Sequence, residues 1–161
     1  MARAGAYDFC FLRIADGVYY SSVARSARYK DIAGLAALVG GLVPRGSEWV
    51  CIFDCKGLSV KHVGLLDVIR KTVNTFEEDE GLIGGLRHFV IINAGPIIQT
   101  GLDFLVSLLD KRGRDRLVKC GTSPIEIVET VRRCGVGLEA LRWLNRATAV
   151  GVDEALPAVV G

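Results

Sequence analysis

The sequence lacks the motifs of the commonest nucleotide-binding and hydrolytic sites. Its 161 residues contain no P-loop, no Gly-x-Gly-x-x-Gly after a strand and no Gly-x-Ser-x-Gly elbow. Histidine is scarce: His62 lies within a helical pattern and His88 at the start of a strand, and both are better explained as structural residues. We therefore predict no catalytic residue, no enzymatic activity and no cofactor.

An even set of cysteines and a strong charge of one sign are also missing. The cysteines number five, an odd count that predicts reduced thiols in the cytoplasm rather than a disulfide framework. Cys51 and Cys55 have no second Cys/His pair at zinc spacing, so we predict small buried thiols and no metal site. A net charge of +2 is too small to indicate a nucleic-acid partner.

Long hydrophobic runs are absent, although 50% of the residues are hydrophobic. No apolar run approaches the roughly 18 residues that a membrane-spanning helix needs. The excess of apolar residues therefore indicates a core or an apolar pocket. The first ten residues include Asp8 and no continuous apolar region, so we expect no secretory signal there. We expect one cytoplasmic domain over residues 1–161.

Segments of strand and helix character alternate along the chain. A helical pattern covers residues 59–76, and a capping box at residues 123–126 starts another helix that ends near Gly135. Asp16-Gly17 predicts a hairpin between the first two strands. Strand character is found at residues 7–14, 18–20, 48–54, 89–93 and 116–120, and a glycine-rich buried helix at 31–43. The alternation predicts an α/β domain with a mostly parallel mixed sheet flanked by helices.

An apolar segment and then a basic cluster follow the strand at residues 89–93. A helix over residues 101–109 would be apolar around most of its circumference, so one face could meet the core and the other a ligand or a membrane. The basic side chains of residues 111–119 form either a solvated loop or a contact with anionic lipid, to which each surface cation contributes about 1 kcal/mol. The residues alone leave both explanations open.

Asp54 stands where the strand at residues 48–54 ends, before Lys56, Gly57 and Ser59. It could act as a base or a metal ligand at the carboxyl edge of a sheet, which is the hypothesis of an α/β enzyme. Alternatively, Asp54 and Ser59 cap the following helix while Gly57 relaxes the turn, and this structural role is the favoured explanation.

In this order the segments resemble the CRAL-TRIO domain, the SEC-fourteen-like lipid-binding fold. Ile52–Val60, IFDCKGLSV, matches a family strand that ends in Asp-x-x-Gly-x-Ser. His88–Ile97, HFVIINAGPI, matches a strand that ends in Ile-Ile-Asn-Ala-Pro, with one glycine inserted before the proline. A lid helix, Leu109-Asp110 and a strand that opens on Arg116 complete the pattern.

The resemblance covers roughly residues 7–150 and implies an apolar lid helix over a hydrophobic cavity floored by the sheet. The residues implied to line the lipid cavity are Trp49, Cys51, Phe53, Val90, Ile92, Ile97 and Phe104. The implied lid residues are Leu102, Leu105, Leu108 and Leu109. The implied headgroup or membrane contacts are Arg116, Lys119, Arg114 and Lys111.

The function implied by the resemblance is to bind a phospholipid or another hydrophobic lipid and to transfer or present it at membranes. The expected partners are the lipid, with phosphoinositides among the candidates, and a transient membrane surface to which the cytoplasmic protein associates peripherally. For an inositol headgroup the nearest acidic candidate is Glu80. Trp49 and Cys51 replace the hydroxyl residues of phosphatidylcholine-binding members. The sequence does not predict the oligomeric state.

Two further expectations concern the size of the domain and the range of functions within the family. The N-terminal helical module of the family is not seen, which predicts a minimal form of a size that would suit a compact genome such as a virus's. Other members of the fold act as protein-interaction scaffolds without lipid cargo. That alternative predicts a cavity filled by side chains such as Trp49.

Overall fold

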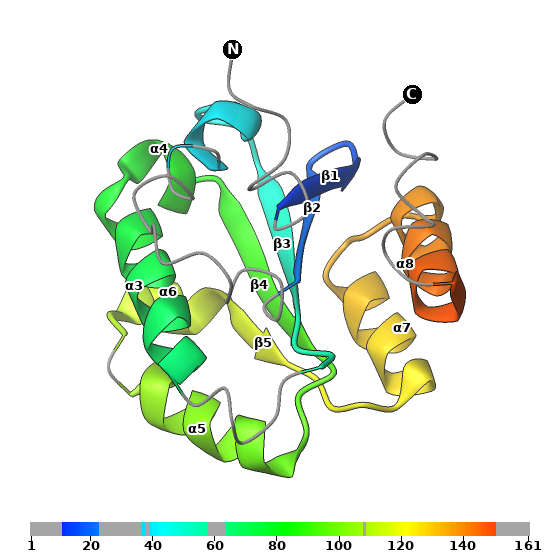
Figure 1. The fold of residues 1–161 in the computed structure, drawn as a ribbon. Coiled ribbons are helices and arrows are strands. Elements are labelled where there is room, and N and C mark those ends of the chain that lie inside the picture. The colour runs from blue at the N-terminus through cyan, green and yellow to red at the C-terminus, as the bar shows by residue number, and fades with distance from the viewer. Residues whose placement is uncertain (1–10, 23–36, 38, 58–63, 108, 151–161) are drawn as a thin grey trace.

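The fold is built on one mixed sheet. The computed structural model describes residues 11–22, 37, 39–57, 64–107 and 109–150. Among these residues a five-stranded sheet has the order β1-β2-β3-β4-β5, with β1 antiparallel to β2 and the other neighbours parallel (Figure 1). The strands are β1 (Leu12–Ala15), β2 (Val18–Ser22), β3 (Trp49–Asp54), β4 (Leu86–Ile92) and β5 (Leu117–Lys119). The predicted α/β fold with a mostly parallel mixed sheet is confirmed.

The hairpin predicted from Asp16-Gly17 joins β1 to β2. Gly17 has a φ of 69°, in the left-handed region that glycine enters without steric cost. The register pairs Leu12 with Tyr20 and Ala15 with Val18. The expected strand residues 7–10 lie outside the described residues.

Helices cover both faces of the sheet. They are α3 (Gly64–Glu78), α4 (Glu80–Ile83), α5 (Pro96–Val106), α6 (Lys111–Arg116), α7 (Pro124–Arg133) and α8 (Leu138–Val150). Residues 37 and 39–42 are helical too; the rest of the helix expected at 31–43, residues 59–63 of the next expected helix and the tail 153–161 lie outside the described residues.

Two apolar cores lie on the two faces of the sheet, which we call the α5 face and the α7 face. Buried side chains of α3, α4 and α5 pack on the α5 face, and those of α7 and α8 pack on the α7 face. Figure 1 shows α3 and α5 on one side of the sheet and α7 and α8 on the other. Among the described residues, the connections from β3 to β4 and from β4 to β5 therefore place their helices on the α5 face, and after β5 the chain passes to the α7 face.

Strand alternation divides the predicted cavity residues between these two faces. Trp49, Cys51 and Phe53 belong to the core of the α5 face. Val90 and Ile92 belong to the core of the α7 face, because neighbouring parallel strands keep register and Val90 pairs with the α7-face residue Ile52. The prediction that Val90 and Ile92 line one cavity with Trp49 was therefore wrong.

Two helices differ from the sequence-based expectation. The basic segment is the helix α6 rather than a loop, because Asp110 caps it by accepting a hydrogen bond from the Gly113 N–H at 3.1 Å. Arg116 ends this helix instead of opening β5. The helix α8 was not predicted, although it has a clear signal: its buried residues are spaced i, i+3, i+4, i+7 at Ala140, Trp143, Leu144 and Ala147.

Candidate functional site

Asp54 joins the carboxyl ends of three strands. Its carboxylate accepts hydrogen bonds from the Tyr20 hydroxyl at 2.5 Å, from the Asn93 side-chain amide at 2.9 Å and from the backbone N–H of Lys56 at 2.9 Å. The last of these bonds is an Asx turn, which Gly57 continues with a φ of 87°. These contacts support the structural explanation of Asp54, as a residue that fixes the loops at this edge of the sheet. Ser59, its expected capping partner, lies outside the described residues.

Asn93 directs the chain from β4 into α5. Its φ is 59°, in the left-handed region that asparagine enters more readily than most residues. The side chain is held by Asp54, and the backbone N–H donates to the Gly121 carbonyl at 3.1 Å. Pro96 then starts α5 at the first helical turn, where a missing N–H costs nothing. The Ile-Ile-Asn-Ala motif thus sets the position of the apolar helix.

The helix α5 presents apolar side chains on two opposite sides. Ile98 and Leu102 are buried in the core of the α5 face, and Leu109 is buried there just after the helix. Ile97 and Phe104, seven residues apart, are 64% and 67% exposed. The side-chain surroundings of Leu105, and all of Leu108, lie outside the described part of the structure. Leu102 and Leu109 contact the core in this arrangement, and their expected contact with acyl chains or a bilayer stays a prediction.

The exposure of Ile97 and Phe104 corrects their expected role as cavity residues. Residues seven apart lie on the same side of a helix, here the side that faces away from the sheet. The sequence could not distinguish the two sides, because α5 is apolar on both. Ile97 and Phe104 are instead open to solvent on the outer side of α5.

Aromatic side chains fill the α5 face beneath these helices. Trp49 is 1% exposed, and its ring centroid lies 5.9 Å from that of Tyr19 and 5.8 Å from that of Phe76 in edge-to-face contacts. The indole Nε1 donates to the Leu82 carbonyl at 2.8 Å. Phe53 stacks on Phe89 with centroids 4.4 Å apart. The described side chains of this face therefore pack against one another, and a ligand would have to displace some of them or enter as α5 moves.

An ion pair links α5 to β5. The Lys119 ammonium, on β5, contacts the Asp103 carboxylate, on α5, and the two side chains are 33% and 60% exposed. An exposed pair of this kind contributes about 0–1 kcal/mol, so it would hold α5 against β5 only weakly. Lys119 is thus paired with Asp103 in this arrangement.

The cations of α6 differ in how freely they could meet a headgroup. Arg116 is half-buried and donates to two backbone carbonyls, that of Leu86 at 2.6 Å and that of Arg112 at 2.7 Å. As placed, its guanidinium holds β4 and α6 together, and the expected headgroup role does not fit this position. Lys111 and Arg114 are exposed; Lys111 pairs with Asp115 at 3.7 Å, and Arg114 makes no ion pair with any described residue.

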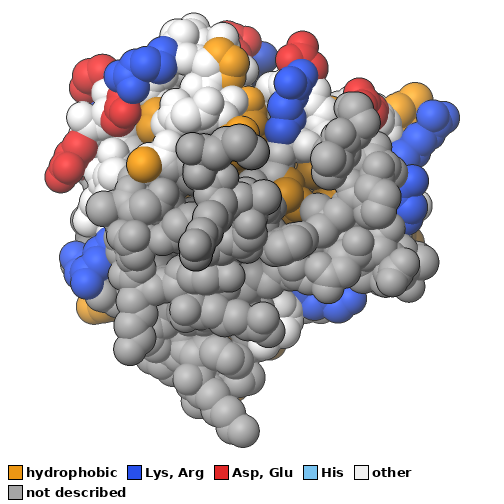
Figure 2. All heavy atoms as spheres, turned by 45° about the horizontal axis from the view of Figure 1, so that its top comes forward, with side chains coloured by type: hydrophobic (Ala, Val, Ile, Leu, Met, Phe, Trp, Pro, Cys, Tyr) orange, Lys and Arg blue, Asp and Glu red, His pale blue; other side chains and the backbone are white. Residues whose placement is uncertain are grey.

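Acidic side chains limit the positive charge around α6. Arg112 forms an ion pair with Glu80 at 2.6 Å and lies 3.9 Å from Asp110. Glu80, the nearest acidic candidate for an inositol headgroup, is therefore already paired. Figure 2 shows another face, where acidic and basic side chains lie beside one another along the upper left edge, as a net charge of only +2 leads one to expect.

Glu77 is a buried carboxyl group between α3 and α6. It is 8% exposed, and its Oε1 has no hydrogen-bond partner among the described residues. Burial raises the pKa of Glu77, and the neighbouring Asp110 carboxylate raises it further. A Cβ at Gly113 would lie only 2.0 Å from this Oε1, so a larger residue there would force the Glu77 carboxyl group to move.

Replacing Glu77 with glutamine is expected to stabilise the protein by about 1 kcal/mol at neutral pH and to flatten its pH dependence. The pKa of Glu77 is higher in the folded than in the unfolded state, so folding takes up a proton between the two values. Stability therefore falls as pH rises from the ordinary glutamate pKa through the raised one. Urea denaturation from pH 4 to pH 8 measures this slope; a slope unchanged in the variant would contradict the assignment.

The described cysteines are free and buried: Cys51, Cys55, Cys120 and Cys134. Burial raises the pKa of the Cys51 thiol strongly, and burial together with the adjacent Asp54 raises the pKa of Cys55 to about 12. Both thiols therefore stay protonated at neutral pH and behave as small apolar groups.

The fold, a mostly parallel mixed sheet with an apolar helix after Asn93, is matched by a known family. A family model described as the CRAL/TRIO domain matches residues 42–131, more than half of the chain. The chain belongs to this family, which in general binds and transfers lipids. A search of curated proteins found no match. Within the described residues, no helix has the length and apolar character needed to cross a membrane.

Proposed function

We propose that the protein binds a lipid tail between α5 and the sheet, and delivers or presents that lipid at the cytoplasmic surface of a membrane on which α5 docks. The observation that carries this proposal is the exposure of Ile97 and Phe104 on the outer side of a helix whose inner side is already buried. An amphipathic helix with large apolar side chains outward inserts them at the boundary between headgroups and acyl chains. Docking would also draw α5 away from the sheet and open a path for the lipid.

The charge next to α5 supports docking on an anionic surface. Lys111 and Arg114 are exposed on α6, and Lys119 is added when its pair with Asp103 opens. Each such cation contributes about 1 kcal/mol near an anionic membrane. Phosphoinositides carry the highest charge per headgroup, so they are the lipid class that we propose. Arg116 is left out of the headgroup contacts because it holds Leu86 and Arg112.

The proposal is tested by native mass spectrometry of the purified protein, followed by extraction and identification of bound lipid. The expected result is one bound phospholipid per protein chain. Sedimentation with vesicles then compares phosphatidylcholine alone with phosphatidylcholine that contains a phosphoinositide. Replacing Lys111 and Arg114 by glutamate should weaken binding to the vesicles that contain a phosphoinositide and leave binding to phosphatidylcholine alone unchanged. The loss should be larger at low salt. An empty protein that takes up no lipid from either vesicle would exclude lipid carriage.

A second function, that of a protein-interaction scaffold without lipid cargo, is favoured by the packing of the α5 face. Trp49 and its aromatic neighbours occupy the space that a lipid tail would need. On this hypothesis the wild-type protein takes up no lipid, whereas Trp49→Ala gains uptake because it empties part of that space. Uptake by the wild-type protein, with no gain in the variant, would exclude the scaffold.

A further inference from the structure

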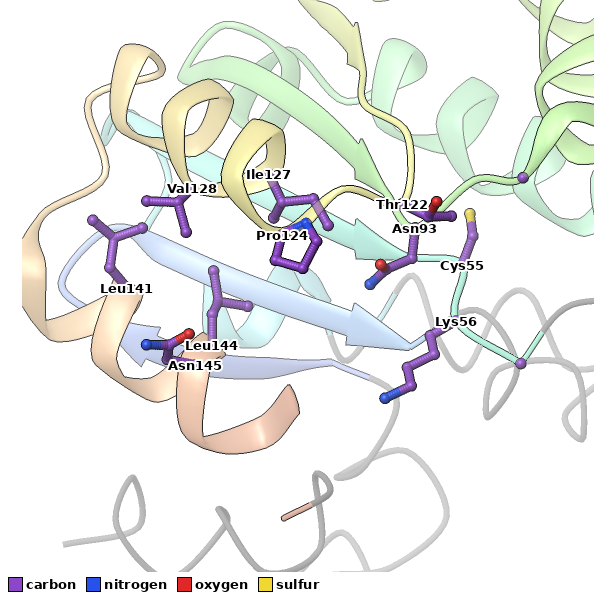
Figure 3. A pocket seen from close by; sticks show the side chains of 12 residues that line it. Cys55, Lys56, Asn93, Thr122, Pro124, Ile127, Val128, Leu141, Leu144 and Asn145 are labelled. Carbon is purple, nitrogen blue, oxygen red and sulfur yellow. The ribbon is translucent and has the colours of Figure 1, made fainter. Parts of the chain in front are cut away.

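A pocket of about 500 Å³ lies on the α7 face, away from the helix α5. Figure 3 shows its walls: α7 contributes Ile127 and Val128, and α8 contributes Leu141 and Leu144. Its right-hand end in Figure 3 is formed by loops that follow the strands, with Asn93 and Thr122 among the residues that line it. The volume is within the range of small-molecule sites, roughly 300–1,000 Å³.

The connections of β4 and β5 explain why a pocket forms here. After β4 the chain turns to α5 on one face of the sheet, whereas after β5 it turns to α7 on the other face. When two neighbouring parallel strands connect to helices on opposite faces, a crevice is left outside their carboxyl ends. This crevice is the usual position of a ligand in open α/β sheets. Gly95 and Thr122, from the two diverging loops, both line the pocket.

The charge of the pocket indicates the sign of its ligand. Lys56 is the only charged residue among the described residues that line it, and its side chain forms no ion pair with any of them. The nearby Asp54 already accepts bonds from Tyr20, from Asn93 and from the backbone of Lys56. The ten-residue helix α7 begins at the pocket with Pro124, so the positive end of its dipole lies on the same side as Lys56, partly offset by Glu126 in its first turn.

We propose that this pocket is a second ligand site, separate from the space under α5, that binds a small amphiphile with one anionic group and one apolar tail. The anionic group lies between Lys56 and the start of α7. The tail lies along the apolar wall that Ile127, Val128 and Leu141 form. A carboxylate and a phosphate monoester share this chemistry, and the experiment separates them.

The test is a titration of the full chain with decanoate, decyl phosphate, decyltrimethylammonium and decanol, followed by heteronuclear NMR. Saturable shifts at residues of α7 and α8 are expected from both anions, with affinities at least about tenfold above that of the cation. The tighter of the two anions identifies the natural headgroup as a carboxylate or a phosphate. No saturable shift, or equal binding of anion and cation, would overturn the proposal.

Two substitutions test the two halves of the pocket. Lys56→Gln should weaken both anions about tenfold and leave decanol unchanged. Val128→Trp should fill the pocket and remove binding of both anions and of decanol; Val128 is 39% exposed, so the fold tolerates the change. Wild-type affinity in either variant would overturn the assignment. The double variant Ile97→Asp, Phe104→Asp should bind the probes in this pocket as tightly as the wild type does. Failure of membrane docking through α5 can therefore be distinguished from failure of the pocket proposal.

Discussion

Replacing Ile97 and Phe104 together by aspartate is expected to lower vesicle binding by at least about 30-fold. Burying a large apolar side chain is worth about 1.5–3 kcal/mol, and about two thirds of each of these side chains is still exposed in the protein. The pair therefore contributes at least about 2 kcal/mol to insertion at a membrane, and two carboxylates add repulsion from anionic lipid. Sedimentation with anionic vesicles, together with a lipid-transfer assay, measures the effect.

The matched control exchanges two other exposed apolar residues that lie away from α5. Ile125 and Leu138 are 74% and 68% exposed, so they match Ile97 and Phe104 in type and exposure. Their replacement by aspartate should leave vesicle binding near the wild-type level. Circular dichroism should show that both double variants keep the fold, because none of the four side chains is buried. If both pairs lose binding alike, the membrane contact is not specific to α5.

Replacing Trp49 by alanine is expected to destabilise the protein by about 3–5 kcal/mol. The indole is almost fully buried between Tyr19 and Phe76, so its removal leaves a cavity that its neighbours can only partly refill. The Leu82 carbonyl also loses its hydrogen bond. Urea denaturation measures the loss, and a change below about 1 kcal/mol would contradict this packing.

A pair of tryptophan-to-phenylalanine substitutions separates the hydrogen bond of Trp49 from its packing. Trp49 and Trp143 are 1% and 2% exposed on opposite faces of the sheet. Trp49 donates to Leu82, whereas the indole Nε1 of Trp143 has no partner among the described residues. Trp49→Phe should therefore cost about 1–3 kcal/mol more than Trp143→Phe. Equal losses would mean that the Trp49 hydrogen bond adds no stability.

Local signals in the sequence predicted most of the fold. Asp16-Gly17 predicted the first hairpin, and the motif at residues 123–126 predicted the start of α7, where the Ser123 hydroxyl accepts from the Glu126 N–H. The strands predicted before Asp54 and Asn93 are also present, as β3 and β4. These elements succeed because their signals depend on residues that are neighbours in the chain.

The site was predicted less well. Period-two alternation placed Trp49, Cys51 and Phe53 together, but nothing within β4 shows which of its two apolar faces meets them. That choice depends on the register between β3 and β4, in which Ile52 pairs with Val90. The role of Arg116 was missed for a similar reason, because its partner Leu86 is thirty residues away in the chain.

By itself, the sequence determined that this is an α/β domain of the CRAL/TRIO family with an apolar helix after Asn93. Only the tertiary structure decided which side of that helix is buried, because α5 has large apolar side chains on both its inner and its outer side and its contacts with the sheet come from distant residues. The structure also decided where a pocket forms. The pocket lies where the chain leaves β4 for α5 on one face of the sheet and leaves β5 for α7 on the other face. No local sequence pattern encodes this choice of faces.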